Sequence, residues 1–184
     1  MFQCFYPDEY LDSTYEIDFE KLYREGYRGL LFDIDNTLVT HGAPPDERAK
    51  KLFLRLSRLG FRSCFVSNTR IGRVSSFCEG LHAYLLANGR DGEEAGLFFL
   101  ENAHKPSRKG YQKAMELTGT DTGNTIFIGD QLFTDIYGAK RAGIRNILVK
   151  PIHPKEEIQI VLKRYLEKIV LFLYKKERKQ LKNN

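Results

Sequence analysis

The sequence predicts an α/β protein with a three-layer, doubly wound, Rossmann-like fold around a mainly parallel sheet of about five strands. Three observations predict it. Short apolar runs alternate with segments whose apolar residues have helical spacing. The apolar runs are continuous, which is typical of strands covered on both faces. Polar residues follow the first four runs, at the edge of a parallel sheet where ligand sites form.

Each expected element has a local signal. Asp18 is suited to cap a short first helix, and Gly60, Gly119 and Gly143 are suited to end three later ones. The expected strands are residues 30–32, 61–66, 97–100, 125–128 and 147–149. The expected helices are residues 18–23, 46–59, 71–86, 107–117, 132–141 and 155–174.

The length of 184 residues suits one main domain. We expect an N-terminal packing arm over residues 1–28, a core over residues 29–152, and a C-terminal helix with a basic tail over residues 153–184. The first segment is rich in tyrosine and polar residues, and we expect no chemistry from it.

The composition favours a globular protein of the cytoplasm. Hydrophobic residues make up 42% and charged residues 29% of the chain. The three cysteines have no metal-ligand spacing, and their odd number indicates a reducing compartment. We see neither a signal peptide nor an apolar stretch long enough for a membrane-spanning helix. The net charge of +5 fits an anionic substrate or surface, and we expect no DNA partner. The sequence leaves the oligomeric state open.

Two carboxylates end the first apolar run. Asp33 and Asp35 lie on the same side of the chain if strand geometry persists. Crowded carboxylates repel one another, and a divalent cation such as Mg²⁺ would relieve this repulsion. The alternative is a turn rich in Asp and Asn, which is common.

The polar strand ends are more informative together than singly. In a parallel sheet, Asp33, Asp35, Ser67, Lys105 and Asp130 would all emerge at one edge. Phosphoryl transfer needs such a set, because charge on the phosphoryl oxygens must be neutralised and the nucleophile aligned. Singly, these residues are equally typical of a turn, a solvated loop or a helix entrance.

These residues resemble the four motifs of the haloacid dehalogenase (HAD) superfamily of phosphatases. The family pattern DxDxT matches residues 33–37, the second motif matches Ser67, the third matches Lys105, and GDxxxxD matches residues 129–135. The wording of residues 66–68, 105–111 and 128–135 is similar to the YqeG branch of subclass IIIA. That branch is similar to the phosphatidylglycerophosphate phosphatases of mitochondria and plastids.

The resemblance implies a HAD fold and a Mg²⁺-dependent phosphatase that works through an aspartyl phosphate. Asp33 is expected to attack phosphorus. Asp35 is expected to protonate the leaving group and then to activate water. Asp33, the main-chain carbonyl of Asp35, and Asp130 are expected to hold Mg²⁺.

The resemblance also implies supporting roles. The hydroxyl of Ser67 and the amide of Asn68 are expected to bind the phosphoryl oxygens, and Lys105 to neutralise them. Asp135 is expected either to support the metal indirectly or to orient Lys105. Thr37 is expected to brace the loop.

The intervals between the motifs leave no room for the cap domain that many family members insert. The site should therefore be open, which suits a lipid headgroup phosphate such as phosphatidylglycerophosphate. A small metabolite or a phosphorylated macromolecule is the alternative substrate.

The C-terminal segment allows two interpretations. An apolar helical face is formed by Ile158, Val161, Leu162, Tyr165, Leu166, Ile169 and Leu173, and residues 175–182 are strongly basic. The helix either covers the sheet or lies on an anionic membrane as a peripheral contact.

Two other classes of protein share some of these sequence features. A phospho-accepting receiver domain also has acids at strand ends, but its accessory acids precede the acceptor by a whole βα unit. A basic RNA- or ribosome-associated binding protein with an idle site is permitted by charge alone, yet an interleaved aromatic and basic motif is lacking.

Overall fold

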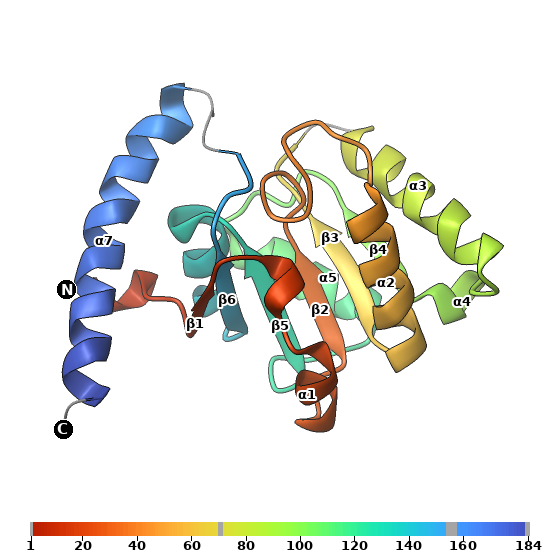
Figure 1. Ribbon diagram of the computed structural model, residues 1–184, viewed down its shortest axis with the longest axis horizontal. Helices are drawn as coiled ribbons and strands as arrows, with labels where there is room; N and C mark the ends of the chain where they lie inside the picture. The colour runs from red at the N-terminus through yellow and green to blue at the C-terminus, as the bar shows by residue number, and fades with distance from the viewer. Residues whose placement is uncertain (1, 70–71, 154–157, 183–184) are drawn as a thin grey trace.

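The computed structural model describes the backbone of residues 2–69, 72–153 and 158–182. Its centre is a parallel sheet with the strand order β1-β6-β5-β2-β3-β4 (Figure 1). The strands are β1 (Glu9–Leu11), β2 (Gly29–Phe32), β3 (Arg62–Val66), β4 (Leu97–Leu100), β5 (Thr125–Gly129) and β6 (Arg145–Val149). The parallel sheet is confirmed, and it has six strands where the sequence predicted about five.

The additional strand, β1, lies within the segment that we expected to be a packing arm. Tyr10 pairs with Leu148 of β6 at the edge of the sheet. The side chains of Asp8 and Asn146 are also hydrogen-bonded, with 2.7 Å between Asn146 Nδ2 and Asp8 Oδ2. A three-residue edge strand without an apolar run gives almost no periodic signal, which explains why sequence analysis missed it.

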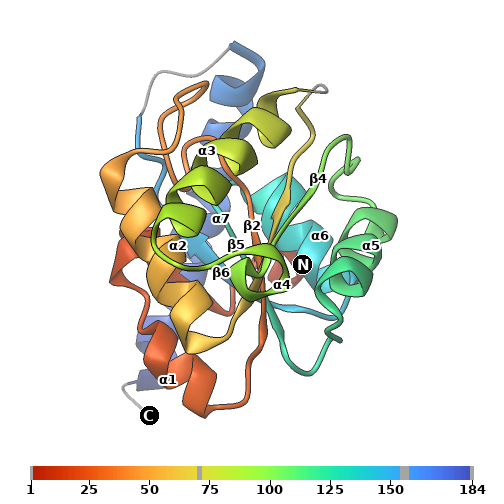
Figure 2. The same ribbon diagram turned by 90° about the vertical axis from the view of Figure 1, so that its right-hand side faces the viewer.

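Helices cover both faces of the sheet (Figure 2). The α-helices are α1 (Phe19–Arg24), α2 (Glu47–Leu59), α3 (Arg73–Ala87), α4 (Gly92–Ala95), α5 (Arg108–Thr118), α6 (Tyr137–Arg141) and α7 (Ile158–Lys182). Short 3-10 turns are η1 (Gln3–Phe5) and η2 (Thr14–Glu16), and η3 (Leu132–Ile136) is a wide π turn. The expected helices over residues 71–86 and 155–174 begin at positions outside the described residues.

Alternate residues of each central strand face opposite layers. Leu30 and Phe32 of β2 pack into the core beneath α1, α2 and α3. Leu31 faces the core beneath α5 and α6, which contains the buried ring of Tyr111. Both faces of the strand are therefore buried, which accounts for the continuous apolar runs.

The predicted helix ends are confirmed at Asp18 and Gly60. Asp18 Oδ1 accepts a hydrogen bond from the N–H of Lys21 at 2.9 Å, and Gly60 ends α2 with a φ of 91°. The single helix expected over residues 132–141 is instead η3 followed by α6.

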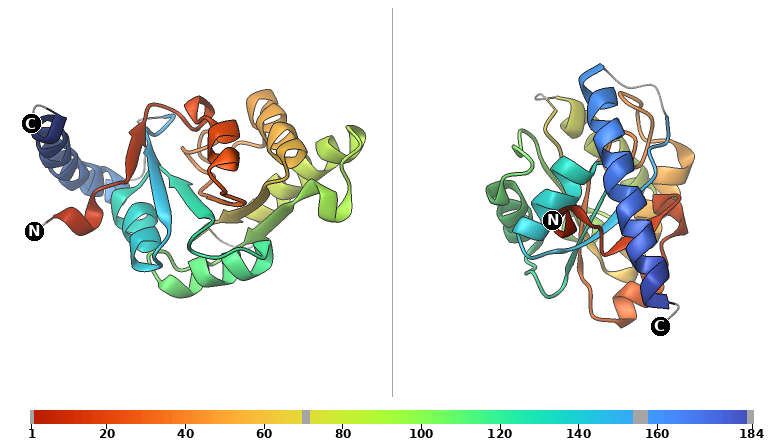
Figure 3. Two further views of the ribbon diagram at one scale, coloured as in Figure 1. Left: turned by 90° about the horizontal axis from the view of Figure 1, so that it is seen from below. Right: turned by 90° about the vertical axis from the view of Figure 1, so that its left-hand side faces the viewer.

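Loops rather than an inserted domain surround the carboxyl ends of the strands. Within the described residues, α2, β3, α3, α4 and β4 occupy the chain between Phe32 and Arg108, so no large cap domain is present there. Helix α7 lies beyond the β1 edge of the sheet (Figure 3). In the described part of the chain, no helix combines the length and apolar character needed to cross a membrane.

Candidate active site

The central position of β2 brings the predicted residues together. Strand β2 lies between β5 and β3, so the loops that follow these strands meet at one edge. Lys105 Nζ lies 2.6 Å from Asp33 Oδ1 and 2.8 Å from Asp135 Oδ1. These side chains and Asp130 are all buried. The structure therefore forms one buried cluster from residues far apart in the sequence.

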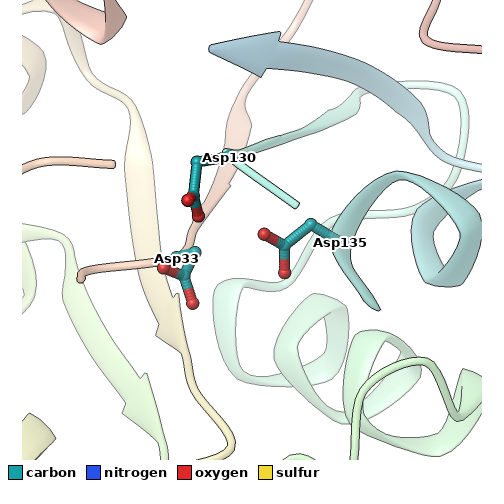
Figure 4. Close-up of side chains that lie close together, drawn as sticks. All are labelled: Asp33, Asp130 and Asp135. Atoms are coloured by element: carbon teal, nitrogen blue, oxygen red, sulfur yellow. The ribbon is translucent and has the colours of Figure 1, made fainter. Parts of the chain in front are cut away.

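Three carboxylates of this cluster point toward a common centre (Figure 4). Asp33, Asp130 and Asp135 each offer an oxygen within 4.8 Å of the others. Lys105 pairs with Asp33 and Asp135. When all three carboxylates are ionised, crowding them together in a low-dielectric interior is unfavourable. A set of carboxylate oxygens is what Mg²⁺ prefers, so the residues present fit this ion.

Burial dominates the electrostatics of Asp33. Burial raises the pKa of Asp33 to about 7, although the positive charge of Lys105 opposes this shift. The Asp135 carboxylate raises the pKa of Asp33 further. For Lys105, burial alone would lower the pKa, but Asp135 and Asp33 outweigh it and raise the pKa, so the ammonium stays charged.

Thr37 links two of the carboxylates to the loop after β2. Its Oγ1 lies 3.3 Å from Asp130 Oδ1 and 3.5 Å from Asp33 Oδ2. The N-terminal segment holds this loop in turn, because Thr14 Oγ1 donates to the Thr37 carbonyl at 2.8 Å and Tyr15 donates to the Leu38 carbonyl at 2.7 Å. The N-terminal segment thus supports the site.

The carboxylate of Asp35 has partners outside this cluster. Asp35 Oδ1 accepts hydrogen bonds from Arg73 and from the N–H of Gly42, both at 2.9 Å. Arg73 also donates to the carbonyl of Ala43 at 2.7 Å. The Asp35 side chain therefore connects the loop after β2 to the start of α3. Sequence analysis missed Arg73, and its place in the first turn of a helix next to a motif was the available signal.

Ser67 and Asn68 lie at the end of β3, beside β2. Ser67 Oγ is 2.7 Å from Thr69 Oγ1. The Asn68 side chain brackets the main chain of Lys105, donating to its carbonyl at 2.9 Å and accepting from its N–H at 2.6 Å. Since both polar side-chain atoms of Asn68 are used in this way, a contact of Asn68 with a phosphoryl oxygen would come from its main-chain N–H.

A close approach of two chain segments positions Asp135. Asp135 Oδ2 accepts a hydrogen bond from the N–H of Gln131 at 3.1 Å. A Cβ atom on Gly129 would lie 2.5 Å from the same oxygen, so only glycine fits there. The buried Tyr111 hydroxyl donates to the carbonyl of Thr134 at 2.8 Å. Tyr111 was missed because a core aromatic on a helix carries no signal of its own.

Comparison with known proteins agrees with this geometry. A family model described as HAD-hydrolase-like matches residues 102–157. The probable phosphatase YqeG of Bacillus subtilis is 30% identical over 94% of this chain and 93% of its own length. Phosphatidylglycerophosphate phosphatase 1 of Arabidopsis thaliana is 30% identical over 87% of this chain, which spans 44% of that protein. A crystal structure of an uncharacterised Listeria monocytogenes protein is 21% identical, with a TM-score of 0.50, over 71% of this chain and 84% of that one.

Fold and site together define the class of HAD-like hydrolases. Within that class, the chain belongs to the YqeG-like branch of the haloacid dehalogenase superfamily of phosphatases. The prediction of a phosphatase enzyme is confirmed at this level.

Proposed function

We propose that the protein is a Mg²⁺-dependent phosphomonoesterase that works through an aspartyl phosphate on Asp33. The observation that carries the proposal is the buried cluster of Asp33, Asp130 and Asp135, with the Lys105 ammonium paired to Asp33 and Asp135. A second cation would balance the remaining negative charge, and a phosphate ester binds where cations are concentrated.

Asp33 is the nucleophile in this proposal. Its carboxylate oxygen forms a bond to phosphorus while the bond from phosphorus to the alcohol oxygen breaks. Asp35 donates the proton that the leaving alcohol takes up. Asp35 then accepts a proton from water, which attacks phosphorus and releases inorganic phosphate from Asp33.

The other residues hold the phosphoryl group or support the residues that do. Lys105 neutralises the phosphoryl oxygens, and Ser67 and the main-chain N–H of Asn68 donate hydrogen bonds to them. Asp135 keeps Lys105 in place through the 2.8 Å ion pair, which favours the orienting role over indirect metal support. Thr37 braces the loop after β2.

Asp33, Asp130 and the main-chain carbonyl of Asp35 would hold Mg²⁺. When bound, the ion would withdraw charge from the phosphoryl oxygens.

A lipid headgroup phosphate, phosphatidylglycerophosphate in particular, is the proposed substrate. Support comes from the Arabidopsis relative that carries this activity in its name, and from the lack of a large cap over the described site. An uncapped site admits a phosphate whose bulk stays outside. We assign the phosphatase core to residues 29–152, with residues 1–28 as a supporting arm and residues 153–184 as a C-terminal helix and basic tail, and we place the protein in the cytoplasm.

The test is phosphate release with Mg²⁺ from a panel of lipid phosphates, sugar phosphates and nucleotides. We expect preference for the lipid phosphate, and loss of turnover in Asp33→Asn and Asp35→Asn with folding retained. Asp91→Asn, an exposed acid away from the cluster, is the matched control. Turnover near wild type in either site variant would refute the mechanism, and preference for a sugar phosphate would refute only the lipid substrate.

The phosphatase relatives do not favour a basic RNA-binding protein with an idle site. That alternative predicts salt-sensitive RNA binding without turnover of any phosphoester on the panel.

A further inference from the structure

Helix α7 exposes several apolar side chains of the face for which the sequence allowed either the sheet or a membrane as partner. Tyr165, Leu166, Ile169 and Phe172 are 61%, 53%, 56% and 67% exposed, and we call them the α7 stripe. Tyr165, Leu166 and Ile169 belong to the predicted apolar face, and these three side chains are exposed, whereas Leu173 of the same face is half-buried. The side chains of residues 158–164 lie outside the described ones.

The opposite face of α7 is fixed to the core. Val170 is buried in a cluster with Leu132 and Leu148, and Tyr174 packs edge-on against Tyr6 with 5.5 Å between ring centroids. The buried Glu167 accepts a hydrogen bond from the N–H of Leu132 at 2.7 Å. Because these contacts hold the inner face, the helix cannot rotate to bury its stripe.

Basic side chains border the α7 stripe. Lys168, Lys175 and Lys179 are exposed, and their spacing of seven and four residues places them along one side of the helix. The groove between β1 and α7, with a volume of about 520 Å³, is lined by Lys175, Arg178 and Lys179 among others. An apolar strip beside a row of lysines is the pattern of a helix that lies in the headgroup region of a bilayer.

We propose that α7 docks on an anionic lipid bilayer through the α7 stripe, with its lysines on the lipid headgroups. Charge complementarity selects this partner. A second copy of the chain would bring the same lysines face to face across a two-fold axis, where they repel. A nucleic acid would contact the lysines and leave the stripe in water.

Docking in this orientation would place the site near the lipid. Asp130 lines a cavity of about 170 Å³ whose other wall includes Lys168 and Leu171 of α7. Lys168 thus lies on the side of α7 nearest the candidate active site. The value of this placement for catalysis rests on the proposed lipid substrate, whereas the docking itself does not.

The test uses flotation of the full chain with vesicles of phosphatidylcholine alone or mixed with phosphatidylglycerol. The triple variant Leu166→Gln, Ile169→Gln, Phe172→Gln should bind mixed vesicles more than about tenfold more weakly. The double variant Leu86→Gln, Phe99→Gln removes exposed apolar side chains elsewhere and should bind like wild type.

Charge is tested with Lys168→Gln, Lys175→Gln, Lys179→Gln, which should weaken binding on the order of 100-fold at low salt. The charge-matched control is Lys21→Gln, Lys51→Gln, Lys113→Gln, and we expect it to bind normally.

Turnover of soluble p-nitrophenyl phosphate separates docking from catalysis. The α7 stripe variant should keep wild-type turnover, because its three residues lie outside the site. Wild-type protein that turns over this ester but does not float with mixed vesicles would refute docking and leave the phosphatase proposal intact. A wild-type dimer that the stripe variant converts to a monomer would also refute docking, because the stripe would then be a protein interface. Docking without turnover would refute the proposed function alone.

Discussion

Replacing Asp33 by Asn should change how stability depends on pH in the metal-free protein. Burial raises the pKa of Asp33 from 3.8 to about 7. Between these values the folded protein holds a proton on Asp33 that the unfolded chain releases. The stabilising contribution of protonated Asp33 to the free energy of unfolding is therefore fully present below about pH 4, and it is lost as the pH rises through about 7.

The size of the effect follows from the shift. A shift of about three units at about 1.4 kcal/mol per unit makes Asp33 cost on the order of 4 kcal/mol at pH 7 relative to pH 4. Asn cannot ionise, so Asp33→Asn should gain about this much relative to wild type across the same window. Lys105 does not change how stability depends on pH in this range, because it is charged in both the folded and the unfolded state.

The assay is urea unfolding followed by far-UV circular dichroism in a chelator, at intervals from pH 4.5 to about pH 7.5. The free-energy difference between Asp33→Asn and wild type should widen steadily with pH. Asp91→Asn, an exposed carboxyl, should run parallel to wild type. If the free energy of unfolding of Asp33→Asn ran parallel to that of wild type across this pH range, the pKa of Asp33 would not be raised, and the reasoning would be refuted. Added Mg²⁺ should stabilise wild type more at high pH, since it binds the ionised carboxylate.

Three further predictions concern the neighbours of Asp33. Lys105→Met leaves buried carboxylates without their cation, so it should destabilise the protein by about 3–5 kcal/mol and abolish phosphate release, measured by unfolding and turnover. Gly129→Ala forces a Cβ against Asp135 and should lower stability by about 1–3 kcal/mol in thermal unfolding, with reduced turnover; an unchanged melting temperature would contradict the close approach. Arg73→Ala frees Asp35 and should slow alkyl phosphates far more than p-nitrophenyl phosphate, whose leaving group needs little protonation; equal slowing of both would show that Arg73 is only structural.

The convergence of the site could be predicted because parallel strands constrain it. Asp33, Lys105 and Asp130 follow strands whose carboxyl ends must lie at one edge, whatever the loops do. No such constraint fixes where a loop side chain points. The partners of Asp35, in particular Arg73 on α3, depend on the path of the loop after β2, and no periodic pattern encodes that path.

The face of α7 shows a different limit of sequence analysis. Periodicity groups Tyr165, Leu166 and Ile169 on one apolar face, yet these side chains are exposed, because burial does not follow from hydrophobicity alone. On the inner face, Glu167 accepts a hydrogen bond from the N–H of Leu132, and Tyr174 packs edge-on against the ring of Tyr6. Tyr6 lies shortly before the strand β1, which sequence analysis also missed.

The two catalytic acids proposed here have environments that suit different tasks. Asp33 is buried and held by Lys105, so its oxygen is fixed, as in-line attack on phosphorus requires. The Asp35 side chain is held instead by Arg73 and by the N–H of Gly42, which come from outside the carboxylate cluster. A general acid and base must meet first the leaving alcohol and then water, and both reach the site from outside. The pairing of Asp35 with Arg73, outside the carboxylate cluster, thus keeps proton transfer separate from the charge balance around the nucleophile.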